Sequence, residues 1–263
     1  MAEPFKNAVK ELFKADKVAL GMIARLGRSG DIARIAKTTG HDFIFVDGQH
    51  ALYSVETTGH IAQAALGCGV VPMARVRSCD DPDTHVILDN GIMGIVFPDI
   101  NTADEARRAV NRAKFPPIGR RSVSGSYTMF DFRAVSTGDA VAMLNEATLV
   151  VCMIETQEGL DNVDAIAAVQ GVDVIHVGSN DLMTSLGMPG AYGTPTHIAA
   201  LDKVFAAAKK HGKVAGIGGD RNLPRQMEFI RKGARFLTTN SDIAFMMAEA
   251  SRVVGELRKA LGA

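Results

Sequence analysis

The chain has 263 residues, close to the length usual for one (β/α)₈ barrel, although this length also allows two small domains. Its 29 Lys and Arg balance its 29 Asp and Glu, so no overall charge favours nucleic acid or an anionic membrane as a partner. The three cysteines include no CxxC pair, and their odd number argues against a disulfide framework.

The N-terminal segment carries no signal-peptide pattern, because residues 5–13 read as a charged amphipathic helix. No apolar run approaches the roughly 20 residues that are needed to span a bilayer. We therefore expect a cytoplasmic protein without a membrane partner.

Eight short apolar runs recur along the chain, separated by helical patterns. Continuous apolar runs, in contrast to alternating ones, indicate parallel strands that are buried on both faces. The predicted strands are residues 18–22 (VALGM), 43–46 (FIFV), 71–76 (VPMARV), 92–97 (IMGIVF), 149–154 (LVVCMI), 172–177 (VDVIHV), 214–217 (VAGI) and 236–239 (FLTT).

Helical spacing of apolar residues fills the gaps between these runs. The clearest helices are residues 82–88, 102–113, 161–169 and 196–211. Thr102 is an N-cap residue, and Gly212 and Gly233 stand where helix C-termini are expected. Strand–helix alternation predicts an α/β fold, and eight repeats favour one closed (β/α)₈ TIM barrel over an open sheet. We see no linker, so residues 1–263 are predicted to form a single domain.

Polar residues follow most of the predicted strands. In a (β/α)₈ barrel the active site lies at the carboxyl ends of the strands, so these residues are expected to converge. In chain order they are Asp47, Gly48, Gln49 and His50; Arg75; Pro98 and Asp99; Glu155; Gly178, Ser179, Asn180 and Asp181; and residues 216–219. The irregular stretch 115–136 is polar and contains glycine, as functional loops often do.

The residue types suggest metal-assisted chemistry on a 2-oxo acid. Glu155 and Asp181 offer hard oxygen ligands for Mg²⁺ or Mn²⁺ and leave coordination positions for water and substrate oxygens. Such a metal would be a Lewis acid that stabilises an enolate. Arg75 can hold the substrate carboxylate or keto oxygen, His50 can be the general base, and backbone N–H groups of residues 178–181 can bind the carboxylate.

The same residues also have structural interpretations. Glu155 can cap the helix that follows it, and Asp181 can be the N-cap of a helix over residues 182–186. An isolated histidine such as His50 is more often structural than catalytic. Arg75 favours a functional site more strongly, because a buried unpaired arginine is costly.

Three further residue types have less weight in the sequence. His176, inside the sixth predicted strand, is interpreted as packed or hydrogen-bonded filling of the barrel. Asp89 can simply terminate a helix. A Schiff-base aldolase would need a lysine at the active site, but Lys17 and Lys213 both precede their strands and so belong to the opposite end of the barrel.

Six segments in a fixed order carry specific motifs over most of the chain. They are residues 43–54 (FIFVDGQHALYS), 71–76 (VPMARV), 88–110 (LDNGIMGIVFPDINTADEARRAV), 115–123 (FPPIGRRSV), 150–166 (VVCMIETQEGLDNVDAI) and 172–187 (VDVIHVGSNDLMTSLG). As a set they resemble the class II pyruvate-type aldolases of the HpcH/HpaI family, which includes 4-hydroxy-2-oxoheptanedioate aldolases.

This resemblance implies a barrel of the phosphoenolpyruvate/pyruvate type with a divalent metal, Mg²⁺, Mn²⁺ or Co²⁺, on Glu155 and Asp181. It places the oxo-acid-binding arginine at Arg75 and the catalytic histidine at His50. Asp47 and Asp89 would support this histidine. The implied reaction is reversible retro-aldol cleavage of a 4-hydroxy-2-oxo acid to an aldehyde and pyruvate, or a related 2-oxo acid such as hydroxypyruvate.

The resemblance also implies an assembly. Members of the family form hexamers, arranged as trimers of dimers, in which C-terminal helices are exchanged between subunits. The apolar residues 243–247 and the helix after them suit such an exchange.

Some positions depart from the family pattern. Gln49 stands where the family has Glu in GEHA, and Ser179 and Asn180 replace Pro and Ala of GPADLS. The loop SGSYTMFDF also differs from the common version. Two alternatives therefore stay open. An acyl-CoA lyase of the same barrel type would need a nucleotide-binding surface, for which Arg120 and Arg121 are the visible basic pair. A non-catalytic barrel that binds an oxo acid is the other.

Overall fold

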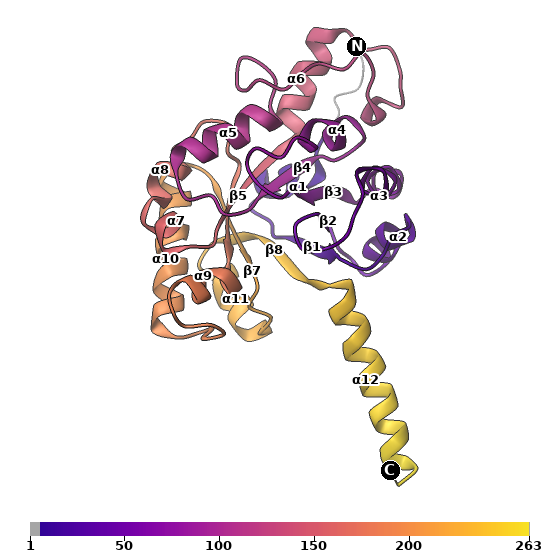
Figure 1. Ribbon diagram of the computed structural model, residues 1–263, viewed down its shortest axis with the longest axis vertical. Coiled ribbons are helices and arrows are strands. Elements are labelled where there is room, and N and C mark those ends of the chain that lie inside the picture. Colours follow the sequence, from indigo (N-terminus) through magenta and orange to yellow (C-terminus); the bar gives the residue numbers. More distant parts are fainter. Residues whose placement is uncertain (1–5, 263) are drawn as a thin grey trace.

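The computed structural model describes residues 6–262, and its centre is a closed barrel of parallel strands that pair in chain order. The last strand pairs with the first, which closes the barrel (Figure 1). This confirms the predicted (β/α)₈ architecture. The strands are β1 (Ala19–Ala24), β2 (Phe43–Asp47), β3 (Val71–Arg75), β4 (Gly94–Phe97), β5 (Leu149–Ile154), β6 (Val174–Gly178), β7 (Val214–Gly218) and β8 (Ala234–Ser241).

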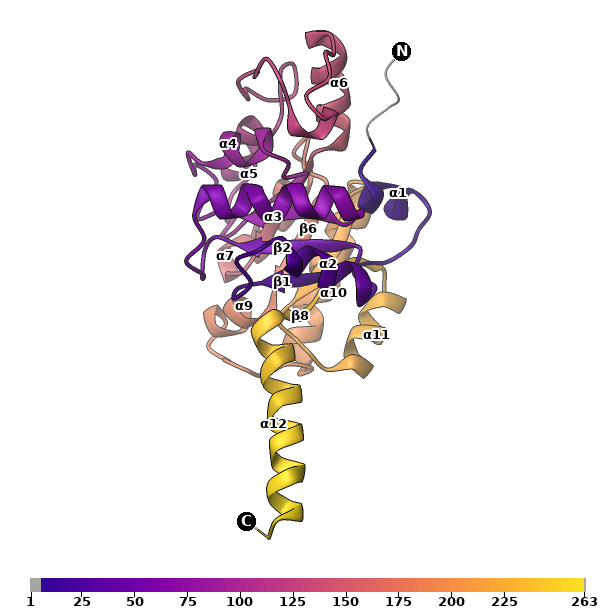
Figure 2. The ribbon, with the colours of Figure 1, turned by 90° about the vertical axis from the view of Figure 1, so that its right-hand side faces the viewer.

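Helices connect the strands and form the outer layer of the barrel (Figures 1 and 2). Thr102 caps one of them through a reciprocal pair of hydrogen bonds with Glu105, as its residue type predicts. The helices are α1 (Ala8–Lys14), α2 (Asp31–Thr38), α3 (Val55–Cys68), α4 (Thr84–Asp89), α5 (Ala103–Ala113), the 3₁₀ turn η1 (Thr128–Phe130), α6 (Thr137–Ala147), α7 (Gln157–Asp161), α8 (Val163–Ala167), α9 (Ser179–Ser185), α10 (Pro195–Lys210), α11 (Leu223–Arg231) and α12 (Asp242–Ala260).

Aromatic side chains close one end of the barrel. The rings of Phe43 and Phe236 stack with their centroids 4.5 Å apart, and Phe13 of α1 meets Phe236 edge-on at 6.4 Å. A Cβ at Gly21 would overlap the Phe43 ring, so the glycine makes room for it. Because Phe43 and Phe236 lie near the starts of β2 and β8, α1 covers the amino end of the barrel. The polar residues that follow the strands lie at the opposite, carboxyl end.

Helix α12 projects away from the barrel after its first turn (Figures 1 and 2). The first residue of the helix attaches it to the barrel. Asp242 is buried, and its carboxylate accepts hydrogen bonds from the backbone N–H groups of Arg25, Leu26 and Gly27 at 2.8–3.0 Å. Most of its apolar side chains are exposed in the single chain. They are Ile243, Phe245, Met246, Met247, Val253, Val254 and Leu257.

Several element boundaries differ from the predicted ones. Strands β4 and β6 begin two residues later than predicted, because the N–H groups of Ile92 and Val172 close turns onto Ile87 and Val169. The predicted helix 161–169 is instead the pair α7 and α8, which meet at Asn162.

Two further predictions are wrong in detail: where the first helix begins, and that the stretch 115–136 is irregular throughout. Asn7 caps α1, which therefore begins at Ala8 and not at residue 5, a residue outside the described part of the chain. The stretch 115–136 contains η1 and a small apolar cluster of its own, in which the rings of Phe115 and Phe130 lie edge-on to that of Tyr127.

Candidate active site

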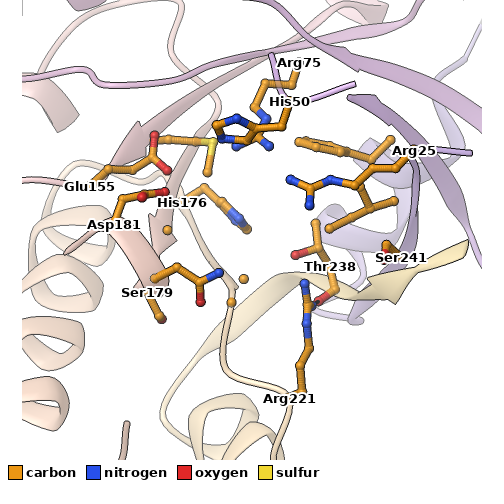
Figure 3. A pocket seen from close by; sticks show the side chains of 17 residues that line it. Arg25, His50, Arg75, Glu155, His176, Ser179, Asp181, Arg221, Thr238 and Ser241 are labelled. Carbon is orange, nitrogen blue, oxygen red and sulfur yellow. Dashed lines mark hydrogen bonds between the residues drawn. The ribbon is translucent and has the colours of Figure 1, made fainter. Parts of the chain in front are cut away.

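A cavity of about 340 Å³ opens at the carboxyl ends of the strands, within the size range of small-molecule sites (Figure 3). Its wall contains most of the residues that the sequence singled out. The predicted residues in the lining are His50, Arg75, Glu155, Gly178, Ser179, Asn180 and Asp181. Asp47 lies against Arg75 with no exposed surface of its own, and Asp89 is not part of the lining.

The carboxylate of Asp47, at the end of β2, holds Arg75 at the end of β3. Arg75 donates from Nε to Oδ1 at 3.0 Å and from Nη2 to Oδ2 at 2.8 Å, and Arg25 Nε donates to Oδ2 at 2.7 Å. Burial alone would raise the pKa of Asp47, but the bonds and charges of these two arginines lower it to about 2. Asp47 is therefore ionised and fixes the Arg75 guanidinium in the cavity wall.

Glu155 follows β5 and is buried at the cavity edge. Its Oε2 accepts the backbone N–H of Asp99 at 3.1 Å. Burial raises the pKa of Glu155 to about 7; the Asp99 N–H and Arg75 oppose this rise, and the charges of Asp99 and Asp181 add to it. A carboxylate in this setting gains strongly from a neighbouring cation.

Asp181 reaches the same part of the cavity from the first turn of α9 (Figure 3). The interpretation of Asp181 as an N-cap is wrong, because the helix starts earlier and Gly178 is its N-terminal boundary. Gly178 also makes room for the carboxylate of Glu155, since a Cβ at this position would overlap that side chain. The turn from β6 into α9 thus depends on a glycine where the two carboxylates meet.

Ser179 and Asn180, two of the residues that depart from the family pattern, have partners of their own. Ser179 is buried, and its Oγ lies 3.1 Å from Nε2 of His197 in α10. Asn180 is exposed, and its Oδ1 accepts the Tyr192 hydroxyl bond at 2.6 Å. Both contacts tie the start of α9 to the segment before and within α10.

His50 is exposed on the loop after β2 and lines the cavity beside Arg75 (Figure 3). Its backbone N–H donates to Asp47 Oδ1 at 3.2 Å, so Asp47 supports the loop that carries it. Asp89 ends α4 and accepts a bond from Arg121 at 2.5 Å. Within one copy of the chain, as far as it is described, the structure does not bring Asp89 to His50.

His176 lies in the floor of the cavity. Its ring meets that of Phe236 edge-on at 5.4 Å, and the side chain is 1% exposed, which agrees with the predicted packing inside the barrel. Among the described residues Nδ1 has no hydrogen-bond partner, so the predicted hydrogen bond is not seen there. Burial, followed by the charges of Arg75 and Arg221, lowers the pKa of His176 to about 3, and the ring is neutral.

The donor set fits a hard divalent cation. Glu155 and Asp181 face one part of the cavity (Figure 3), and both offer carboxylate oxygens. Across residues 6–262, no cluster of three or more His, Cys, Asp or Glu side chains is arranged to hold an ion. The chain would thus supply two ligands, and oxygens of water and substrate would complete the coordination.

Sequence reasoning missed four polar residues of the lining. Arg25 and Arg221 follow β1 and β7, and Thr238 and Ser241 belong to β8. Arg25 directly follows β1 in the structure, but the predicted strand ended at residue 22, so the residue after that strand was not Arg25. Arg221 is separated from β7 by Gly219 and Asp220. Residues 218–222 contain no apolar side chain, so no hydrophobic periodicity pointed to Arg221.

The profile of the HpcH/HpaI aldolase/citrate lyase family matches residues 23–248. The chain belongs to this family. The 4-hydroxy-4-methyl-2-oxoglutarate aldolase of Chaetomium globosum is 39% identical over 218 residues, which are 82% of this chain and 81% of that one. The 5-keto-4-deoxy-D-glucarate aldolase of Salmonella paratyphi A is 33% identical over 257 residues, 97% and 98% of the two chains.

The fold of this HpcH/HpaI family member agrees with a solved structure of the family. The crystal structure of an HpcH/HpaI aldolase from Desulfitobacterium hafniense superposes with a TM-score of 0.90 at 30% identity, covering 95% of this chain and 96% of the other. Since its relatives are aldolases, the chain is a carbon–carbon lyase. No helix among residues 6–262 is both long and apolar enough to cross a membrane.

Proposed function

We propose that this enzyme is a divalent-metal-dependent aldolase that reversibly cleaves a 4-hydroxy-2-oxo acid to pyruvate, or a related 2-oxo acid, and a second carbonyl compound. One observation carries the proposal: the carboxylates of Glu155 and Asp181 share a cavity with Arg75 and His50 in a chain of an aldolase family. The relatives named above act on 4-hydroxy-2-oxo acids of this kind, which supports the reaction type.

We assign the metal to Glu155 and Asp181. When bound there, Mg²⁺, Mn²⁺ or Co²⁺ would supply Lewis acidity toward the 2-oxo acid. Glu155 is suited to this role because its burial makes the free ionised carboxylate costly, and a cation removes that cost. Asp181 is exposed to the cavity and can reach the same ion without rearrangement of the barrel.

We assign substrate orientation to Arg75 and to the segment 178–181. The guanidinium of Arg75, fixed by Asp47, can hold an oxygen of the 2-oxo acid and stabilise the charge that develops on it. The polar groups of Gly178, Ser179 and Asn180 would border the same end of the substrate. Preorganisation of this kind lowers the cost of orientation in the transition state.

We assign proton transfer to His50. In the cleavage direction it would take the proton of the C4 hydroxyl, directly or through water, as the C3–C4 bond breaks. The electron pair of that bond passes to the 2-oxo acid half as an enolate, C4 becomes a carbonyl, and a proton then adds to C3. His50 is exposed at the cavity and near Arg75, as this role requires.

The alternatives have less support. For an acyl-CoA lyase, the basic pair that would bind the nucleotide is incomplete, because Arg121 is buried and bonded to Asp89. Calorimetric binding of a CoA ester would restore this option. Two observations argue against a non-catalytic barrel that binds an oxo acid: Asp47 holds Arg75 in the cavity wall, and the chain belongs to a family of aldolases.

The proposed reaction is tested by pyruvate release from a 4-hydroxy-2-oxo acid. The protein is stripped with EDTA and then supplied with Mg²⁺, Mn²⁺ or Co²⁺. We expect release only in the metal-supplied samples. Full activity after complete metal removal would refute the metal assignment, and no activity with any 4-hydroxy-2-oxo acid would refute the reaction.

We further propose that α12 of one chain packs on another copy, in a hexamer built as a trimer of dimers around one barrel domain per chain. The exposed apolar side chains of α12, among them Phe245, Met246 and Leu257, support this proposal. Light scattering coupled to gel filtration should report a hexamer. A chain truncated before α12 should then form an assembly of fewer subunits, whereas a monomeric full-length chain would contradict the proposal.

A further inference from the structure

One buried polar side chain of the cavity has no task in the reaction proposed above. His176 lies inside β6, and its ring forms part of the cavity floor while the residue is 1% exposed (Figure 3). The metal ligands, Arg75 and His50 account for the proposed steps. An imidazole in the floor is costly unless a polar group meets it, because a buried polar atom without a hydrogen bond loses its hydration for nothing.

The ring of His176 has no hydrogen-bond partner among the described residues. Nδ1 is buried and unpaired, and no hydrogen bond within residues 6–262 reaches Nε2. The edge-on contact with Phe236 is packing and leaves both nitrogens unsatisfied. Burial keeps the ring neutral, since it lowers the pKa of His176 to about 3. The missing partner is therefore to be sought among the molecules that enter the cavity.

Two glycines of β7 leave space around this ring. Gly216 is paired in register with His176, and a Cβ there would lie 2.7 Å from Nδ1. A Cβ at Gly218 would lie 2.9 Å from Nε2. Because Gly218 is closer to the carboxyl end of β7, Nε2 is the nitrogen on the side of the cavity. A side chain at Gly218 would cover it, and the glycine keeps it accessible to a ligand.

A second uncharged polar group adjoins the same spot. The position of a Cβ on Gly218 is 2.5 Å from Oγ1 of Thr238 in β8, so the hydroxyl and the imidazole flank one point of the floor (Figure 3). The other floor residues in the lining are apolar, namely Ile23, Phe45 and Met153. The floor thus contains a local polar niche, made by His176 and Thr238, in an otherwise apolar surface.

The chemistry of this niche matches a hydroxyl group. A neutral imidazole offers one N–H and one lone pair, and the two tautomers exchange their places. A hydroxyl both donates and accepts, so it can bond to Nε2 in either tautomer and to the Thr238 hydroxyl as well. A methyl group would leave Nε2 unpaired, and a carboxylate would gain no charge attraction from a neutral ring.

The position of the niche indicates which hydroxyl it meets. His50, to which the C4 hydroxyl is assigned, is on the loop after β2 at the rim of the cavity, whereas His176 lies deeper, within its strand. A second hydroxyl that points to the floor beside the metal-bound end belongs to C3, the carbon next to the keto group. In the cleavage product this carbon is part of the 2-oxo acid.

We propose that His176, together with Thr238, binds a hydroxyl on C3 of the 2-oxo acid half, so that the enzyme prefers hydroxypyruvate to pyruvate. This inference rests on the proposed function and specifies the 2-oxo acid that the cleavage releases. The corresponding substrates are 3,4-dihydroxy-2-oxo acids. His176 determines specificity and transfers no proton in the reaction.

The proposal is tested by equilibrium binding, which needs no second carbonyl compound. Hydroxypyruvate and pyruvate differ only in the C3 hydroxyl. With the Mg²⁺-loaded wild-type protein, calorimetry should show about fivefold or stronger preference for hydroxypyruvate, because the hydroxyl supplies a partner to a buried group that pyruvate leaves unpaired. Equal affinities, or tighter binding of pyruvate, overturn the proposal.

Variants assign the preference to the niche. His176→Phe keeps a ring of similar shape but removes both nitrogens, so the preference should fall below about twofold while pyruvate still binds. His176→Gln, with a side-chain amide that donates and accepts, should retain part of it. Thr238→Val should weaken the preference and Thr238→Ser should keep it. His60→Gln, on the exposed face of α3, is the control.

Two results with these variants would overturn the proposal. One is an unchanged preference in His176→Phe. The other is a loss of affinity for both acids in equal proportion, because that is the effect of a ring that only fills the barrel. Comparing the two acids within each variant separates recognition of the hydroxyl from a general disturbance of the site.

A crystal structure of the wild-type protein with Mg²⁺ and hydroxypyruvate gives a test that needs no variant. The C3 hydroxyl should lie within hydrogen-bond distance of His176 Nε2, and a hydroxyl directed to other residues overturns the proposal. Failure of the proposed function has a different signature, because no 4-hydroxy-2-oxo acid would then be cleaved. An enzyme that cleaves such acids with a metal but binds pyruvate and hydroxypyruvate equally contradicts this inference alone.

Discussion

Arg75 and Asp47 form a two-point ion pair between the ends of β3 and β2, with contacts of 3.0 and 2.8 Å. Asp47 has no exposed surface, and it also holds Arg25 and the backbone of His50. One buried carboxylate therefore sets the position of three groups that line the cavity. Substitutions of Asp47 should therefore alter the geometry of the site, although Asp47 itself does not line the cavity.

Replacing Asp47 by Asn should lower both activity and stability. Removing one partner of a buried ion pair typically costs about 3–5 kcal/mol. Loss of the positioned Arg75 should reduce kcat/KM about 10²-fold or more, the usual effect of removing one transition-state donor. Urea unfolding and steady-state kinetics measure the two effects. Asp161→Asn, in a surface pair with Lys203, is the control and should change stability by less than about 1 kcal/mol.

Replacing Glu155 by Gln should strongly weaken metal binding while the fold is kept. The amide has the same shape, but it removes one of two charged ligands, so Mn²⁺ affinity should fall by at least about 100-fold, more than the loss of an outer partner. Because burial penalises the ionised carboxylate, the metal-free variant should be as stable as the wild type at pH 8. Exposed Glu158→Gln should bind Mn²⁺ normally. Equal affinity in Glu155→Gln would remove Glu155 from the metal site.

Metal affinity should depend on pH through Glu155. Its pKa in the metal-free folded protein is raised to about 7 from an ordinary 4.5, so folding favours the protonated form. The metal-free protein should lose stability as the pH rises from 4.5 to 7, and the metal should displace a proton in that range. Calorimetry in buffers of different ionisation heats should show proton release at pH 6 and almost none at pH 8.5. Equal release at both values would contradict this assignment.

Replacing His50 by Ala should separate catalysis from metal binding. Loss of a general base typically costs about 10²- to 10⁴-fold in rate. Mn²⁺ affinity should be nearly unchanged, because the proposed ligands are carboxylates. His60→Ala, on the exposed face of α3, is the matched control. Turnover that survives in His50→Ala would assign the base to another group.

Replacing Gly178 by Ala should disturb the metal site through geometry alone. The new Cβ would overlap the Glu155 carboxylate, which must then move or displace the turn into α9. We expect weaker Mn²⁺ binding and lower kcat, with far-UV circular dichroism unchanged. Gly138→Ala in α6 has no neighbouring atom within 4 Å and should have no such effect. Wild-type Mn²⁺ affinity in Gly178→Ala would show that the carboxylate has room to adjust.

The barrel itself was predictable from local pattern. Continuous apolar runs such as those of β2 and β5 match their strands closely, because strands buried on both faces need apolar side chains at successive positions. Boundaries were less predictable where a turn uses apolar residues. Ile92 and Val172 look like strand residues in the sequence, but their N–H groups close the preceding turns.

The site was predictable in part, because strand-end residues converge in any closed barrel. That rule placed Glu155 and Arg75 together. It did not show that Asp47 forms the ion pair with Arg75, since ion pairing depends on side-chain directions across neighbouring strands. Asp89 shows the limit of motif reasoning, because in the single chain it pairs with Arg121.

The central claim is that Glu155 and Asp181 hold a metal that lets Arg75 and His50 act on a 2-oxo acid. Exchange of pyruvate methyl protons in D₂O, followed by NMR, tests it without knowledge of the second carbonyl compound. We predict exchange with Mg²⁺ or Mn²⁺, no exchange after EDTA, and recovery when the metal is returned. Exchange that continues in the metal-free protein at the same rate would contradict the claim.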